Sequence, residues 1–444
     1  MKRSFVLALV LCASVLPALP AASKGGIERG RVGVLLVDHG EPPIYNRDTY
    51  ASFRKFFDHL IEMGLIPSWV KLIDNGTVLQ DPECYGCGEA GASTFLDAWL
   101  DRHEGPAVPM PESSSAAAHH VVPGGPGAGE PDVFEQVGLG AWHEWELMGG
   151  RSPNYDQKLA KKKVVIERLR DRYGDDLPIR IGYGIDPRIG GGRQGIRQAI
   201  TALVEKDDVD ELVVAYHGVG FSDIMQTHML RHDIHEVLDE MGADVELRYT
   251  APIGTTDAYV DTVVDEVRRE LKAMPPKAPV AIHLSGHGLP TGTCGDYDCG
   301  ADAYHEYSDR LFARTSRAIE AAGLHDGRLG VFHLYGDGAT EEDDAEDEAD
   351  SPIEALDKRK EAGFEYVIDI PYEFDSDSRD TLIILRTGYG LTLPDWNEGF
   401  ETYFRYKGMR VKISNSAFGQ TGKIAAYEEV IRDALSKSDI DGRP

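Results

Sequence analysis

Basic residues and cysteines are both scarce in this chain of 444 residues. Lys and Arg number 46 against 75 Asp and Glu, which gives a formal net charge of −29. So acidic a chain repels the phosphates of nucleic acids, so we expect no nucleic-acid partner. Hydrophobic residues make up 42% of the chain and charged residues 27%, which is typical of a globular protein. At roughly 150 residues per domain, the length predicts two or three domains.

Long apolar runs are missing beyond the N-terminus. There, Lys2 and Arg3 precede an apolar run from Phe5 to Leu19, and small residues follow up to Ser23. This order is typical of a secretory signal peptide over residues 1–23. The run is short and interrupted by proline, so we do not expect it to span a membrane. We therefore expect an exported, periplasmic protein, or a cytoplasmic one if the start codon is misassigned.

Four cysteines lie outside that segment, as Cys84-x2-Cys87 and Cys294-x4-Cys299. In an oxidising compartment, we expect each pair to close a small loop as a disulfide. A joint four-cysteine metal or cluster site is the alternative, and the spacing alone does not decide between them.

Apolar strand-like segments alternate with helix-like segments along the chain, which predicts βαβ units and mostly parallel sheets. Strands are expected at Val32–Asp38, Ile179–Gly182, Leu212–Tyr216, Val245–Tyr249, Val280–Ser285, Leu329–Leu334, Tyr366–Ile370 and Leu382–Leu385. Helices are expected at Leu159–Tyr173, Ile224–Met241, Ala258–Met274, Ala303–Ala322, Ile353–Ala362, Glu398–Tyr406 and Lys423–Leu435. In the first of these helices, Lys161, Lys162 and Lys163 are expected to form a basic outer face.

Two segments differ from the rest in composition. An insertion over about 75–139 contains a stretch rich in Pro, Gly, Ala and Ser at 105–131, which we expect to be flexible. Residues 341–350 are almost all acidic, and such a run predicts a solvated loop.

An internal repeat links the two ends of the chain. The apolar run that starts at Val32 ends in His39-Gly40-Glu-Pro, and the run that starts at Val280 ends in His287-Gly288-Leu-Pro. A strand ending in His-Gly-x-Pro, used twice, favours two related α/β halves. Chance similarity between two buried strands is the alternative.

Three histidines share one sequence context. His39, His217 and His287 each follow an apolar strand and precede a glycine. Ligands bind beyond the carboxyl ends of the strands in open parallel sheets. An imidazole there can bind a divalent metal or move a proton near neutral pH. The shared context favours a common site, whereas a single histidine would be read as a packing residue.

Two motifs resemble those of the ferrochelatases, which are class II tetrapyrrole chelatases. Residues 286–290, Gly-His-Gly-Leu-Pro, are similar to their metal-site motif, and residues 149–153, Gly-Gly-Arg-Ser-Pro, resemble their Gly-Gly-x-Ser-Pro loop. Weaker similarities lie at residues 34–42, 212–222 and 368–380.

The resemblance implies two Rossmann-like α/β domains with parallel sheets flanking a central cleft. We expect an N-terminal half over residues 31–250, a C-terminal half over 251–420, and a C-terminal helix and tail over 421–444.

The resemblance also implies a catalytic pair, His287 and Asp380, acting as metal ligand and proton acceptor. The family usually carries Glu where this chain has Asp380. His39 is a further candidate metal ligand. It stands where the family often has Tyr or Met, and it is similar to a residue of the small cobalt chelatases.

Three further residues are candidates for binding the tetrapyrrole. His217 would line the cleft or deliver metal, or else pack within a turn. Ser152 would bond a tetrapyrrole carboxylate, or else cap the helix that follows Pro153. Arg151 would pair with a propionate, or else be solvated. Asp375 and Asp377 are expected to lie in a polar loop near Asp380.

Together these residues predict a lyase that inserts a divalent metal into a porphyrin, as ferrochelatases do in haem biosynthesis. Fe²⁺ is the expected metal substrate, with Co²⁺ and Zn²⁺ as alternatives. No iron–sulfur cluster is expected, since no cysteine follows Cys299.

Two other functions stay open: an exported protein that binds haem, porphyrin or metal without turnover, and a sirohydrochlorin cobaltochelatase, which His39 favours. The tetrapyrrole is the expected partner, while a peripheral membrane contact and the oligomeric state are left open.

Overall fold

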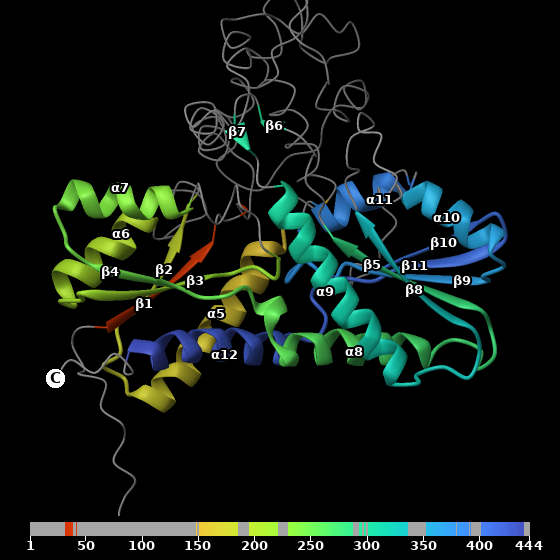
Figure 1. Ribbon diagram of the computed structural model, residues 1–444, viewed down its shortest axis with the longest axis horizontal. Helices are drawn as coiled ribbons and strands as arrows, with labels where there is room; N and C mark the ends of the chain where they lie inside the picture. The colour runs from red at the N-terminus through yellow and green to blue at the C-terminus, as the bar shows by residue number, and fades with distance from the viewer. Residues whose placement is uncertain are drawn as a thin grey trace, which may run out of the picture.

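Two β-sheets, lying side by side, form the framework of the protein in a computed structural model (Figure 1). The structure describes residues 32–38, 41, 148, 151–184, 195–220, 230–286, 293–294, 297–298, 301–335, 352–378, 380–389, 391 and 401–438. The predicted signal peptide, the insertion at 75–139, the acidic run, His39 and His287 lie outside these residues, as do the pairings expected for the cysteines.

The first sheet has four parallel strands. Their order is β2 (Ile179–Tyr183), β1 (Val32–Asp38), β3 (Glu211–Tyr216) and β4 (Glu246–Tyr249). The strand β1 lies in the middle and is buried on both faces, because its side chains alternate between two cores. Val34 and Leu36 enter the core that contains α5, whereas Leu35 and Val37 enter the core that contains α6 and α7.

The second sheet has five strands in the order β10 (Thr402–Tyr406), β11 (Met409–Ile413), β9 (Tyr366–Ile370), β5 (Val280–Gly286) and β8 (Leu329–Tyr335). All neighbouring strands are parallel except β10 and β11. Starting from β8, the order β8-β5-β9-β11 follows the chain in the same way as β2-β1-β3-β4 in the first sheet. The predicted α/β class and the equivalence of the two repeated strands are therefore confirmed: β1 and β5 occupy the same central position. A short antiparallel pair, β6 (Thr293–Cys294) and β7 (Tyr297–Asp298), stands apart.

Helices cover both faces of each sheet. The first half contains α5 (Asn154–Tyr173), α6 (Ile196–Thr201), the π-helix η2 (Ala202–Lys206) and α7 (Arg231–Met241). The second half contains the 3-10 turn η4 (Ile253–Thr255), α8 (Asp257–Leu271), α9 (Ala301–Ala321), α10 (Pro352–Glu361), the π-helix η5 (Asp380–Ile384) and α11 (Leu385–Gly388). Thr256 begins α8 in the manner of an N-cap, because its hydroxyl accepts the Tyr259 N–H at 3.1 Å.

The C-terminal helix α12 (Gln420–Ser438) ties the halves together. It packs on α8, on α5 and on β3, and in Figure 1 it runs below the first sheet towards α8. One hydrophobic core consequently extends from β1 and α5 through α12 and α8 to β5. Such continuity of buried apolar surface predicts that the two halves are stabilised together.

Two predicted elements are wrong. Leu382–Leu385, expected as a strand, belongs to η5 and α11, since a short apolar run fits a buried helix as well as a strand. The expected helix at Glu398–Tyr406 contains the strand β10, which forms a hairpin with β11. Lys407 and Gly408 form its turn with φ values of 45° and 90°, the conformation that two-residue hairpins favour.

In the described part of the chain, no helix combines the length and apolar character needed to cross a bilayer.

Candidate functional site

In each sheet the order in which the chain adds strands reverses at one interior strand, which is β1 in the first sheet and β5 in the second. The chain adds β2 on one side of β1 and β3 on the other, and likewise β8 and β9 on the two sides of β5. Ligands of such sheets bind beyond the carboxyl ends of the strands at this point. The chain places Asp38 and His217 there in the first half. In the second half it places Gly286 there, together with residues 371–378, called the bridging segment below.

Asp38 and Asp375 form a buried cluster with three lysines of α5, called the lysine–aspartate cluster. Lys158 Nζ and Lys162 Nζ each lie 3.2 Å from one Asp38 oxygen. Lys161 Nζ lies 2.8 Å from Asp375 Oδ2, and it also donates to the Asp375 carbonyl oxygen. Because α5 belongs to the first half and Asp375 to the bridging segment, the Lys161–Asp375 pair joins the two halves, whereas the pairs with Asp38 hold α5 on β1.

The predicted basic outer face of this helix is wrong. Lys161 is 2% exposed and Lys162 is fully buried, so of the three expected residues only Lys163 is exposed. The sequence held a signal for this: Lys158, Lys161 and Lys162 recur at the helical spacing that continues to buried Val165 and Leu169. Lysines that are paired with carboxylates can occupy the buried stripe of a helix, so their charge alone does not place them on its outer face.

Burial and neighbouring charges shift the pKa values of the cluster in different directions. Burial lowers the pKa of Lys162 to about 8 and also lowers the pKa of Lys161. For Lys158, burial acts in the same direction, but the Asp38 and Asp375 carboxylates outweigh it and its pKa is raised. For Asp375, burial alone would raise the pKa, but Lys161 and its other charged neighbours hold it well below its usual value. Asp375 is thus ionised at neutral pH and is the counter-charge of Lys161, whereas Asp38 is the nearer carboxylate for Lys158 and Lys162.

His217 lies against this cluster at the end of β3. Its ring stacks on Tyr427 of α12, with centroids 4.2 Å apart and planes 4° apart. Nδ1 lies 3.0 Å from Asp375 Oδ2, and Nε2 has no hydrogen-bond partner among the described residues. Burial lowers the pKa of His217 to about 4, so the imidazole is neutral at pH 7. A neutral imidazole can accept a proton or coordinate a metal ion.

The bridging segment also carries Glu373, which sequence reasoning missed. Tyr304 OH donates to Oε2 at 2.5 Å, and Ser308 Oγ donates to Oε1. His333 Nε2 lies 3.1 Å from Ser308 Oγ and 4.0 Å from Glu373 Oε1. The only available signal was an acid that follows the end of β9 within three residues.

Glu373 is packed directly against the end of β5. A Cβ added to Gly286 would lie 2.5 Å from Glu373 Oε2, closer than real Cβ contacts come. Gly286 is the residue before His287 in the chain. A carboxylate is therefore fixed by two hydroxyl groups beside the residue that leads into the predicted metal-site histidine.

The bridging segment contacts both halves through further polar groups. Asp377 accepts from Gln157 Nε2 at 2.9 Å and from the Ser416 N–H at 2.6 Å. A further bond between the halves is that of Tyr307 OH of α9, which donates to the Val219 carbonyl at 2.8 Å. Asp375 and Asp377 lie in a polar loop, as expected, but both are buried there and bonded to other segments.

The other predicted residues lie as follows. Asp380 is half-buried and begins η5. Ser152 is fully buried; its hydroxyl donates to the Glu41 carboxylate and accepts the Asn154 N–H at 3.2 Å, so it helps to begin α5. Arg151 is exposed and forms a two-pronged pair with Asp156 at 2.8 Å.

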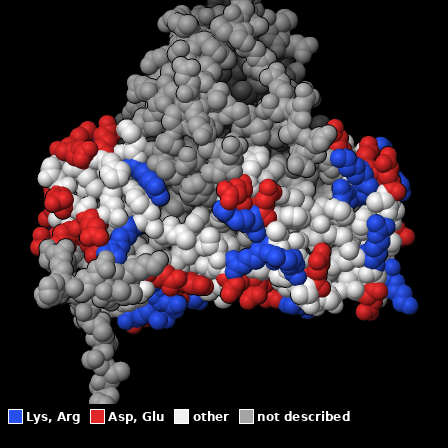
Figure 2. All heavy atoms as spheres, viewed as in Figure 1, with Lys and Arg blue, Asp and Glu red and all other residues white. Residues whose placement is uncertain are grey.

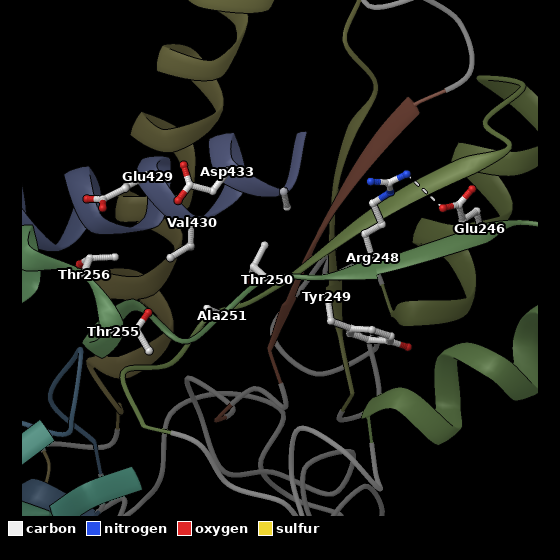
Figure 3. A pocket seen from close by; sticks show the side chains of 11 residues that line it. Glu246, Arg248, Tyr249, Thr250, Ala251, Thr255, Thr256, Glu429, Val430 and Asp433 are labelled. Atoms are coloured by element: carbon white, nitrogen blue, oxygen red, sulfur yellow. Dashed lines mark hydrogen bonds and ion pairs between the residues drawn. The ribbon is translucent and has the colours of Figure 1, made fainter. Parts of the chain in front are cut away.

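A separate cavity of about 460 Å³ lies between β4 and α12 (Figure 3). Its lining includes Arg248 and Tyr249 from β4 and Glu429 and Asp433 from α12. Figure 3 shows the two acids on one side and the arginine, bonded to Glu246 at 3.1 Å, on the other. Its lining contains none of the predicted site residues that the structure describes.

No protein-family model and no curated protein matches this chain. Among solved structures it is similar to SirB from Bacillus subtilis with Fe³⁺, at 11% identity and a TM-score of 0.39, over 64% of this chain and 91% of that one. It is similar to the sirohydrochlorin chelatase SirB from Bacillus subtilis subspecies spizizenii in complex with cobalt, at 8% identity and a TM-score of 0.36, over 64% and 92% of the two chains. A multi-domain protein from Deinococcus radiodurans with structural similarity to chelatases matches at 13% identity and a TM-score of 0.33, over 64% and 52%. Similarity at this level assigns no function to the chain, whose site is defined by its own residues.

Proposed function

We propose that this protein inserts a divalent metal ion into a tetrapyrrole. The observation that carries the proposal is the position of Glu373, whose carboxylate is held by Tyr304 and Ser308 against Gly286, the first residue of the Gly-His-Gly-Leu-Pro motif. A carboxylate and an imidazole that act together form a pair suited to holding a divalent ion and accepting protons.

The reaction needs two proton acceptors and one metal site. The macrocycle gives up two pyrrole protons and takes one divalent ion into its plane. His287 would accept one proton or deliver the ion, and Glu373 would take the other proton or hold the ion. Asp380, the acid expected from the sequence, is the alternative partner of His287. His217, neutral and buried at the end of β3, would line the same edge from the other half.

The lysine–aspartate cluster and the bridging segment would act as a frame. Lys158 and Lys162 would hold α5 on the end of β1, and Lys161 would hold α5 on the bridging segment that follows β9, all through buried ion pairs. A rigid frame keeps catalytic groups in place while a macrocycle is bound and distorted.

Fe²⁺ and a porphyrin are the substrates expected from the sequence motifs. Co²⁺ and sirohydrochlorin are the alternative that His39 favours. We further propose export to the periplasm, which the residues at 1–23 support.

The experiment is an anaerobic metalation assay on the purified protein, comparing Glu373→Gln with Asp380→Asn. Loss of a group that transfers protons in the transition state costs roughly 10²–10⁴-fold in rate. We expect Glu373→Gln to lose turnover on this scale while tetrapyrrole affinity is kept, and Asp380→Asn to be the milder change. Wild-type protein that binds a tetrapyrrole tightly but never turns over would contradict the enzyme and favour the exported binding protein.

A further inference from the structure

The helix α7 carries a group of metal-ligand types outside the candidate site. His232, Asp233 and Glu236 each offer one ligand atom, and these atoms lie within 4.8 Å of one another. Residues three and four apart on a helix are neighbours on one face, so His232 and Asp233 both lie beside Glu236. We infer that these three residues form a second divalent-metal site, independent of the tetrapyrrole.

The geometry is close to that of a first-row metal site. Imidazole nitrogens and carboxylate oxygens bind such ions at about 2.0–2.2 Å, which puts ligand atoms about 3–3.5 Å apart. The three side chains therefore need to close by little more than an ångström. His232 and Glu236 are exposed and Asp233 is half-buried, so the movement involves side chains at the surface of α7 and not the core.

The ligand set selects the class of ion. One imidazole and two carboxylates suit Fe²⁺, Co²⁺ or Zn²⁺, whereas Ca²⁺ and Mg²⁺ favour oxygen ligands alone. Three protein ligands leave coordination positions to water, so a bound ion would exchange readily.

The surroundings of the group favour a cation on balance. The N-terminal end of a helix opposes positive charge, and this limits the affinity. However, α7 carries four acids against one base, Arg231, and Figure 2 shows acidic side chains gathered over this helix. The Arg231 guanidinium lies over the Tyr249 ring of β4, 4.2 Å from the ring centroid, and so it is directed towards that strand.

The position of α7 places the group at the functional edge of the sheet. The helix connects the parallel strands β3 and β4, so it runs back against their direction. Its first turn, which holds His232 and Asp233, therefore lies towards the carboxyl ends of the strands, the same edge as Asp38 and His217. An ion held there would be close to the place where the strand ends present their ligands.

The test is a Co²⁺ titration of the full-length His287→Ala protein, followed by visible absorption and by NMR of the histidine ring Cε1–Hε1 groups. We expect a saturable Co²⁺ site that broadens the His232 signal. His232→Ala should abolish this site, and Glu236→Gln should weaken it by at least about tenfold. His235→Ala and Asp239→Asn change an exposed imidazole and an exposed carboxylate of the same helix, and both should leave Co²⁺ binding unchanged.

Two results would overturn the inference. One is a Co²⁺ affinity that His232→Ala and Glu236→Gln leave unaltered. The other is an equal loss in all four variants, which would show attraction to acidic charge in general. Because the titration needs no tetrapyrrole and no turnover, its outcome is separate from that of the proposed function.

Discussion

Asp375 pairs with buried Lys161 across the two halves, so its replacement by Asn tests the frame directly. The side chain is 5% exposed. Its carboxylate lies 2.8 Å from Lys161 Nζ, accepts from Tyr427 OH at 3.1 Å and lies 4.0 Å from Lys158 Nζ. Removing one partner of a buried ion pair costs roughly 3–5 kcal/mol, because the remaining charge stays buried without compensation. We expect Asp375→Asn to lower the free energy of unfolding by that amount at pH 7.

The matched control is Asp156→Asn. Asp156 also pairs with a basic residue, Arg151, at 2.7 Å, but both side chains are about half exposed, at 52% and 50%. Exposed pairs contribute about 0.2–1 kcal/mol. Urea unfolding followed by circular dichroism measures both variants. Adding Lys161→Met to Asp375→Asn should recover part of the loss, with a coupling of about 1–3 kcal/mol. The reasoning is refuted if Asp375→Asn costs no more than Asp156→Asn.

Three further predictions concern pH, backbone packing and the chemistry of the candidate site. The pKa of His217 is about 4 in the folded protein against 6.5 ordinarily, so the unfolded chain takes up a proton that the folded one excludes. Stability from this group is present above about pH 6.5 and is lost as the pH falls towards 4. His217→Phe should remove this dependence of the free energy of unfolding on pH, as measured by urea unfolding between pH 4 and 6.5. An unchanged dependence would contradict a neutral His217. Asp369 acts in the opposite sense, because burial raises its pKa to about 6, so its contribution to stability is lost as the pH rises from about 4 to 6. Asp369→Asn should remove this loss, and a stability profile parallel to that of the wild type would contradict the prediction. A Cβ at Gly286 would meet Glu373 Oε2 at 2.5 Å, whereas one at Gly220 would meet it at 4.0 Å. Gly286→Ala should therefore reduce metalation while Gly220→Ala does not, and equal activity of the two variants would argue against a role for the Glu373 carboxylate.

Most of the fold could be predicted from the sequence because its central strands are buried on both faces. Such strands appear as largely apolar runs, as in β1 and β5, and their shared ending predicted two related halves. The errors fall where burial is lower or a run is short. The segment of η5 and α11 offers an apolar run without periodicity. The β10–β11 hairpin depends on the conformation of Lys407 and Gly408, which apolar spacing does not report.

The candidate site was predictable only where it follows strand ends. His217 lies at the predicted edge, because a histidine directly after an apolar strand must emerge there. The lysine–aspartate cluster was missed because its members come from β1, α5 and the bridging segment, and spacing along the chain does not show which charges meet. Glu373 was missed for the same reason: its partners Tyr304 and Ser308 lie on α9, far away in the sequence.

The most direct test of the central claim is an anaerobic metalation assay of wild-type protein and His287→Ala. Protoporphyrin or sirohydrochlorin is mixed with Fe²⁺, Co²⁺ or Zn²⁺, and the change in tetrapyrrole absorbance is timed. The account predicts multiple turnovers by the wild type with at least one pair, and a rate reduced by roughly 10²–10⁴-fold in His287→Ala. Metal insertion at the wild-type rate by His287→Ala would contradict it.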